Sequence, residues 1–183
     1  KPDELISLAS QHDMLIVDEA FCDVEPDYSV GPRMPENVMV LKSMGKFFGL
    51  AGMRLGFAIS SVSYAARLQE MMGTWSVSGP ALEIGAKAMS DSKWKEETRE
   101  KLHIQSQRLA DLLREAGLNV TGINPLFVFA ESQNARAIYE HLARREILVR
   151  PFGQMPNHLR FGLCRNDAQF ARLKEALLEF PDV

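Results

Sequence analysis

Residues 38–59 read VMVLKSMGKFFGLAGMRLGFAI, and this stretch decides the fold. Both of its ends are short apolar runs bounded by glycine or polar residues, a pattern typical of buried strands rather than helices. The segment between them carries Ser43, Lys46 and Arg54 among several glycines. The stretch therefore predicts a lysine in a glycine-rich connection just beyond a strand end, where α/β proteins commonly place their functional groups.

The three polar side chains of this connection suggest a chemistry. An amine such as that of Lys46 forms a Schiff base with an aldehyde, and a hydroxyl and a guanidinium (Ser43 and Arg54) suit a phosphate. Pyridoxal phosphate carries both an aldehyde and a phosphate. The residue types therefore indicate a site for pyridoxal 5′-phosphate.

A second apolar run, residues 14–17 (MLIV), leads into Asp18-Glu19-Ala20-Phe21. If this run is a strand of the same sheet, its terminal carboxylate at Asp18 lies across the cofactor from Lys46. Pyridoxal enzymes need such an acid, because a carboxylate beside the ring nitrogen keeps the nitrogen protonated and the ring electron-withdrawing.

The DEAF sequence, the SMGK sequence and an arginine eight residues after the lysine resemble the class I/II aminotransferase family of fold-type I pyridoxal-phosphate enzymes. The similarity is greatest to the branch that holds the threonine-phosphate decarboxylases of cobalamin synthesis and the related histidinol-phosphate aminotransferases. It is carried by residues 17–26, 42–58 and 75–91, and it runs over essentially the whole chain.

The resemblance implies a role for each candidate residue. Lys46 is the catalytic, cofactor-binding lysine, Asp18 stabilises the pyridinium, and Ser43 with Arg54 holds the cofactor phosphate. Phe21 stands where many aminotransferases carry a tyrosine that hydrogen-bonds the cofactor's O3′, a contact that phenylalanine cannot make. Arg160 corresponds to the arginine that binds the substrate carboxylate.

The function implied by the resemblance is decarboxylation of L-threonine O-3-phosphate. Transamination of the histidinol-phosphate type is the alternative, because the same ring chemistry serves both and the orientation of the substrate selects the bond that breaks. A non-catalytic binding module or regulator built on a degenerate aminotransferase-like domain is a further alternative. Small-molecule substrates are the expected partners.

Other interpretations of the same residues remain. Lys46 could be an ordinary exposed loop lysine, and Arg160 an edge-strand arginine that faces water. Arg150 could reach a substrate phosphate or be a solvated charge. Residues 14–19 also resemble the acidic strand end of a P-loop ATPase, but no GxxxxGK[ST] sequence occurs. The glycines after Lys46 do not form GxGxxG either, so a dinucleotide site is unsupported.

The composition of the chain limits the kinds of molecule that it is expected to bind. The 183 residues are 46% hydrophobic and 25% charged, and the formal net charge is −3, so bulk charge does not favour nucleic acid or an anionic membrane. The two cysteines, Cys22 and Cys164, form no CxxC pattern, which fits unpaired thiols in a reducing cytoplasm. The four histidines show no metal-ligand spacing, so no metal site is expected.

The order of expected elements favours an α/β protein. Expected helices span 2–11, 63–73, 80–90, 93–113, 135–145 and 167–180, and expected strands 14–17, 37–41, 55–60, 118–121, 126–130, 147–150 and 159–163. In helix 80–90 we expect Leu82, Ile84, Ala86 and Met89 to be buried. The charged helix near 93 divides the chain into residues 1–91, the C-terminal part of a large cofactor-binding domain, and 92–183, an interdomain helix and a small α+β domain.

The chain opens directly in a helix, and its first strands need partners that it does not supply. The upstream parts of the family's site, including its ring-stacking aromatic and phosphate-binding turn, have no match in the sequence. We therefore expect a C-terminal half of such an enzyme, inactive by itself, whose full-length form is a homodimer.

Overall fold

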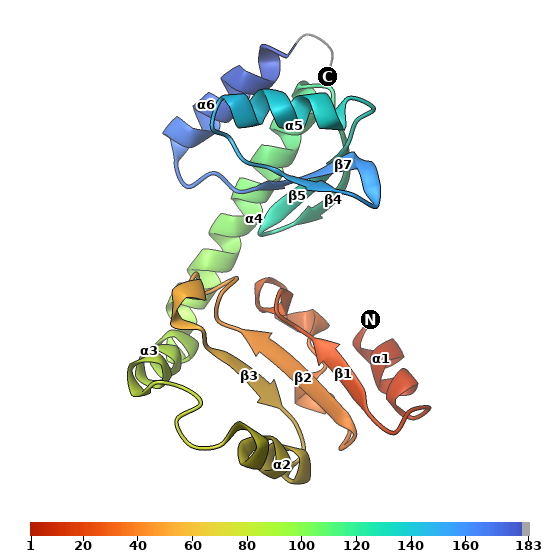
Figure 1. Ribbon diagram of the computed structural model, residues 1–183, viewed down its shortest axis with the longest axis vertical. Coiled ribbons are helices and arrows are strands. Elements are labelled where there is room, and N and C mark those ends of the chain that lie inside the picture. Colours follow the sequence, from red (N-terminus) through yellow and green to blue (C-terminus); the bar gives the residue numbers. More distant parts are fainter. Residues whose placement is uncertain (181–183) are drawn as a thin grey trace. The chain divides into compact units, whose positions relative to one another are not determined.

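A computed structural model describes residues 1–180 of the chain. It divides into two compact units, Lys1–Lys95 and Glu96–Val183 (Figure 1). Each unit has its own sheet, so the chain has the predicted α/β character. The assignment of the two units to a cofactor-binding and a small domain remains a prediction.

The first unit contains a three-stranded sheet in the order β1-β2-β3. β1 (Leu15–Asp18) runs parallel to β2 (Val38–Ser43), and β3 (Gly56–Ile59) pairs with β2 in the antiparallel direction. The prediction that the strand before Asp18 and the strand before Lys46 belong to one sheet is therefore confirmed. Because β1 and β2 are parallel, their carboxyl ends meet at one edge of the sheet.

One face of this sheet packs against α1 (Pro2–Ala9) and the connection that follows β1. Val38 and Val40 of β2 are almost fully buried in a cluster with Ala9 and Val30. Acidic residues in the first turn of α1 and its early proline favour a helix start there. The covered face holds the carboxyl ends of β1 and β2 in place.

The connection from β1 to β2 spans residues 19–37. It contains three short 3₁₀ helices, namely η1 (Cys22–Val24), η2 (Pro26–Tyr28) and η3 (Gly31–Arg33). Proline stands in the first turn of two of them, where its fixed φ suits a helix start. A fourth, η4 (Ala51–Met53), precedes β3.

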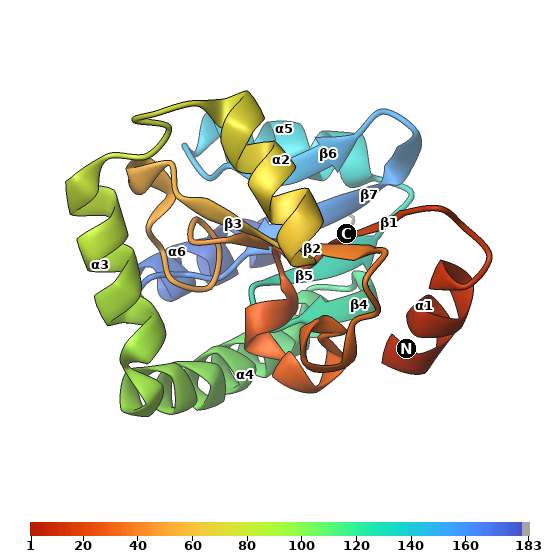
Figure 2. The ribbon, with the colours of Figure 1, turned by 90° about the horizontal axis from the view of Figure 1, so that it is seen from below.

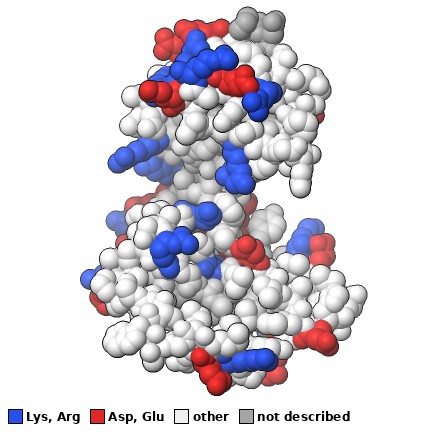
Figure 3. Space-filling model, in the orientation of Figure 1, with Lys and Arg blue, Asp and Glu red and all other residues white. Residues whose placement is uncertain are grey.

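α2 (Val62–Met72) is followed by its C-cap Gly73, whose φ of 68° favours glycine. A segment of turns and bends, yellow in Figures 1 and 2, joins it to α3 (Gly79–Ser90). The expectation for α3 was wrong. The buried residues of this helix are the small Ala81 and Gly85, whereas the four residues expected to be buried are exposed, namely Leu82, Ile84, Ala86 and Met89. Few charged side chains cover this part of the first unit in Figure 3.

α4 (Ser92–Glu115) begins in the first unit and continues into the second, where its last turns are buried. The second unit then holds an antiparallel sheet in the order β4-β5-β7-β6. The strands are β4 (Asn119–Asn124), β5 (Phe127–Glu131), β6 (Arg150–Phe152) and β7 (Met155–Gly162). α5 (Ala135–Arg144) and α6 (Asp167–Leu178) complete the core of the unit with the end of α4.

Three strands of the second unit differ from the predicted ranges. β4 ends three residues beyond the predicted end at 121, β6 shares only Arg150 with the predicted run 147–150, and β7 begins four residues before the predicted start at 159. The start of β7 was missed because it contains Pro156 and Asn157, and proline and asparagine are depleted in strands. No helix in residues 1–180 combines the length and the apolar character that crossing a membrane requires.

Candidate functional site

The ends of β1 and β2 bring two predicted site residues to the same edge of the first sheet. Asp18, the last residue of β1, pairs in register with Leu41, and Ser43 ends β2 two residues further on. Side chains alternate between the faces of a sheet, so Asp18, Leu41 and Ser43 share one face. This face is the one opposite α1, since Val38 and Val40 point to the other. Asp18 is exposed there and accepts a hydrogen bond of 2.9 Å from the Ala20 N–H.

Lys46 lies in a tight turn that its neighbours anchor from both sides. Met44 and Phe47 are 2% and 4% exposed, whereas Lys46 is exposed. Its carbonyl accepts from the Gly49 N–H at 3.0 Å, and Gly49 takes a φ of 68°, which a side chain would disfavour. The Lys46 side chain is therefore exposed to solvent, and the backbone of its turn is held in place by its buried neighbours.

The Ser43 hydroxyl oxygen accepts a hydrogen bond from the Gly45 N–H at 3.1 Å, which ties the end of β2 to the lysine turn. Gly45 allows a close approach, because a Cβ at this position would lie only 3.2 Å from Ala51 Cα. The hydroxyl, the turn and η4 therefore form one compact group. Small residues here leave room for a ligand next to the backbone.

Phe21 lies against Lys46. The lysine Nζ is 5.4 Å from the centroid of the Phe21 ring, within the range of a cation–π contact. This contact joins the turn after β1 to the turn after β2 and places Lys46 near the residue three positions beyond Asp18. The Phe21 ring has no hydroxyl that could hydrogen-bond a cofactor, and its described contact is with the lysine ammonium.

Arg54 caps η4 with φ 52° and ψ 36°, in the left-handed region. This conformation is costly for a residue with a side chain and is a feature of many functional sites. Arg54 is exposed and forms no ion pair within the part of the chain that the structure describes. Its guanidinium is therefore available for an anion.

The last predicted residue, Arg160, belongs to the second unit. It lies in β7 between β5 and β6, so its strand is not an edge strand. Its guanidinium stacks on Phe127, with its Cζ 5.0 Å from the ring centroid, and it faces Arg150 in the register of β6 and β7. Burial and the like charge of Arg150 lower the pKa of Arg160. Two guanidinium groups side by side on one face favour an anionic ligand.

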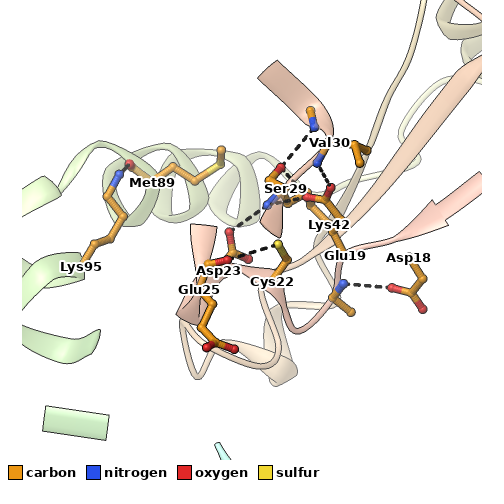
Figure 4. Close-up of polar contacts among 12 residues, drawn as sticks. Asp18, Glu19, Cys22, Asp23, Glu25, Ser29, Val30, Lys42, Met89 and Lys95 are labelled. Carbon is orange, nitrogen blue, oxygen red and sulfur yellow. Dashed lines mark hydrogen bonds and ion pairs between the residues drawn. The ribbon is translucent and has the colours of Figure 1, made fainter. Parts of the chain in front are cut away.

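Sequence reasoning missed a group of charged residues on the covered face of the first sheet: Glu19, Asp23 and Lys42 (Figure 4). Lys42 bridges the two carboxylates, with 3.1 Å to each. Burial lowers its pKa, but Asp23 and Glu19 outweigh this effect and the net pKa is raised. The sequence feature that could have indicated this group is the alternation of side chains along a strand. Of two successive carboxylates, Asp18 and Glu19, only one can face a ligand.

Cys22 lies beside this group. Burial and the negative charge of Glu19 raise the pKa of its thiol to about 11, although Lys42 partly opposes them. A thiol with this pKa is a poor nucleophile at neutral pH. Among the described residues, no group of three or more His, Cys, Asp or Glu is arranged to hold a metal ion.

Comparison with known proteins places this chain in a family. The sequence model of "Aminotransferase class I and II" matches residues 2–177, and the chain belongs to this family. It is 41% identical over 169 residues to a threonine-phosphate decarboxylase of Pseudomonas aeruginosa, covering 92% of the chain and 51% of that protein. It is 33% identical over 193 residues to a histidinol-phosphate aminotransferase of Oleidesulfovibrio alaskensis, covering 96% of the chain and 50% of that protein.

The fold is shared with a crystal structure of histidinol-phosphate aminotransferase from Sinorhizobium meliloti in complex with pyridoxal 5′-phosphate. The TM-score is 0.85 at 22% identity, and the match covers 97% of this chain and 52% of that one. The predicted fold, part of a fold-type I transferase, is therefore confirmed. The chain spans about half the length of the curated relatives it matches.

Proposed function

We propose that the full-length protein containing this chain is a pyridoxal-phosphate-dependent decarboxylase of L-threonine O-3-phosphate in cobalamin synthesis, acting as a cytoplasmic homodimer. The proposed substrate is supported by the 41% identity to a protein named threonine-phosphate decarboxylase. The proposed chemistry is supported by the exposed Lys46 amine beside Phe21, at the sheet edge where Asp18 lies.

The residues at this edge fit pyridoxal phosphate. The Lys46 Nζ would bond to the aldehyde carbon, and the Asp18 carboxylate would pair with the protonated ring nitrogen. Ser43 and Arg54 would hold the phosphate, because a hydroxyl and a planar guanidinium both donate hydrogen bonds to phosphate oxygens. The compact backbone at Gly45 supports the phosphate position, since a side chain there would press on Ala51.

When bound, the cofactor accepts the electron pair left behind when a bond at the substrate Cα breaks. Asp18 strengthens this effect by keeping the ring nitrogen charged. With cofactor and substrate bound, the Lys46 amine would carry a proton to Cα. Phe21 holds that amine near the turn after β1 by contact with its ring face.

Arg160 would select the bond that breaks by holding the substrate carboxylate. A guanidinium binds a carboxylate through two parallel hydrogen bonds, which fixes orientation as well as position. Arg150, its partner across the β6–β7 pair, would supply a second cation on the same face for the substrate phosphate. A substrate with both a carboxylate and a phosphate suits this pair of charges.

The test is to incubate the purified full-length protein with cofactor and L-threonine O-3-phosphate, with and without 2-oxoglutarate. The proposal expects release of CO₂ that does not depend on the keto acid, and loss of that release in Lys46→Ala. Absence of CO₂ together with formation of glutamate from 2-oxoglutarate would overturn it.

A second candidate is an aminotransferase of the histidinol-phosphate type, favoured by the 33% identity to a protein of that name. The same residues would serve, with Lys46 moving the Cα proton rather than returning one after CO₂ has left. Formation of glutamate from 2-oxoglutarate, with histidinol phosphate in place of threonine phosphate as the amino donor, would support this candidate.

A further inference from the structure

Glu19 is a buried charge directly beside a predicted cofactor ligand. It is 4% exposed, and within the described residues only Ser106 is another buried polar side chain. The Glu19 carboxylate accepts 2.7 Å hydrogen bonds from the Val30 N–H and the Ser29 hydroxyl, and Lys42 Nζ lies 3.1 Å away (Figure 4). A charge in this position persists only when it is paired and fully hydrogen-bonded.

These contacts cross from β1 to β2 at the site edge. The Glu19 N–H donates to the Leu41 carbonyl at 2.8 Å, so the β1–β2 pairing continues one residue beyond Asp18. By alternation, Glu19 and Lys42 then occupy the face covered by α1, and Asp18 and Ser43 occupy the opposite face. The ion pair therefore lies directly behind the two residues proposed to hold the cofactor.

The turn after β1 is built on Glu19. The Glu19 carbonyl accepts from the Cys22 N–H at 3.0 Å, and Lys42 reaches Asp23 at the next position of the turn. Ala20, within this turn, donates its N–H to the Asp18 carboxylate, and Phe21 contacts Lys46. A shift of Glu19 would therefore move both the carboxylate and the ring that face the cofactor.

We propose that Glu19, held by Lys42, Ser29 and Val30, is a positioning residue for the pyridoxal-phosphate site. It touches neither the cofactor nor the substrate. It fixes the separation of the β1 and β2 ends and the orientation of the Asp18 carboxylate and the Phe21 ring. This inference rests on the proposed function, because it assumes that Asp18 pairs with the ring nitrogen.

The test compares full-length wild type with Glu19→Gln and Lys42→Met. The exposed Asp3–Arg33 pair of the same unit, 2.9 Å apart, provides the matched control Asp3→Asn. Three quantities are measured: the melting temperature without cofactor, the dissociation constant of pyridoxal phosphate, and the ¹⁵N chemical shift of its ring nitrogen. The last reports directly on the pairing with Asp18, which a purely structural role of Glu19 would leave unchanged.

For Glu19→Gln and Lys42→Met, well below their melting temperatures, we expect cofactor binding about 10- to 100-fold weaker, as is typical when a group that orients a ligand is lost. The ring-nitrogen signal should move toward that of unprotonated pyridine. Asp3→Asn should match wild type in both quantities. Lys42→Arg, which keeps the charge, should recover most of the affinity.

If Glu19→Gln does not fold, Ser29→Ala removes one of the three hydrogen-bond donors and keeps both charges. Its cofactor affinity should then fall about threefold, as expected for one partly compensated hydrogen bond. Affinity and ring-nitrogen signal equal to wild type, in Glu19→Gln or in Ser29→Ala, would overturn the inference alone. A wild-type protein that binds no pyridoxal phosphate would overturn the proposed function and the inference together.

Discussion

The left-handed backbone of Arg54 allows stability and cofactor binding to be separated by two substitutions. Arg54→Gly and Arg54→Ala both remove the guanidinium, but only glycine adopts the φ of 52° freely. The left-handed conformation costs a residue with a Cβ about 1–2 kcal/mol. Glycine loses about 0.5–1 kcal/mol more than alanine through the entropy of its unfolded chain. From the midpoints of these two ranges, the free energy of unfolding of Arg54→Gly should exceed that of Arg54→Ala by about 0.75 kcal/mol.

Cofactor binding should not follow this order. A charge-assisted hydrogen bond contributes about 1.5–3 kcal/mol, so both variants should bind pyridoxal phosphate about 10- to 100-fold more weakly than wild type. Urea unfolding of the full-length protein without cofactor gives the stabilities, and absorbance titration gives the affinities.

Glu146 provides the control for this experiment. It also has a left-handed φ, of 56°, its side chain is 91% exposed, and it lies in the unit that carries no predicted cofactor contact. Glu146→Gly and Glu146→Ala should differ in stability as the Arg54 pair does, with cofactor affinity unchanged. Equal stability of the two Arg54 variants would refute the backbone argument. Wild-type affinity in either would refute the phosphate role of Arg54.

Three further predictions concern other parts of the chain. Because the pKa of Cys22 is raised from 9.0 to about 11, its thiolate fraction at pH 8 is about 100-fold below that of an ordinary thiol. In Cys164→Ser, alkylation at pH 8 followed by mass spectrometry should be correspondingly slow, and a rate like that of free cysteine would contradict this. Phe161 is 1% exposed in the core of the second unit, so Phe161→Ala should lower the free energy of unfolding by about 3–5 kcal/mol, as measured with urea. Leu148 is exposed, and Leu148→Ala should change the free energy of unfolding by no more than about 0.5 kcal/mol. Arg160→Lys keeps the charge but loses the paired hydrogen bonds, so steady-state assays should show KM for threonine phosphate raised about tenfold with the cofactor spectrum unchanged, and an unaltered KM would exclude the carboxylate role.

The sequence was sufficient for the parts of the fold that follow from local patterns. Short apolar runs ending in Asp18 and before Lys46 indicated two strands of one sheet, and these strands are parallel and adjacent. The long charged helix predicted at 93–113 is α4, because a narrow apolar stripe repeats along it.

The parts that depend on distant contacts were not predicted. In α3 the larger Leu82 and Ile84 are exposed, because Gly85 faces Leu55 so closely that a Cβ at position 85 would lie 2.4 Å from the leucine side chain. The sequence showed two acids in a row, but not that Glu19 would be buried with Lys42 as its partner. It also showed that Phe21 lacks a hydroxyl, but not that its ring would lie against Lys46.

The account depends most on the amine of Lys46. The decisive measurement is to add pyridoxal phosphate to the full-length protein, reduce with borohydride, digest, and locate the pyridoxyl group by mass spectrometry. We predict a single stoichiometric adduct on Lys46, abolished in Lys46→Arg and absent from the other exposed lysines. A protein labelled at other lysines as readily as at Lys46, or not labelled at all, would contradict the account.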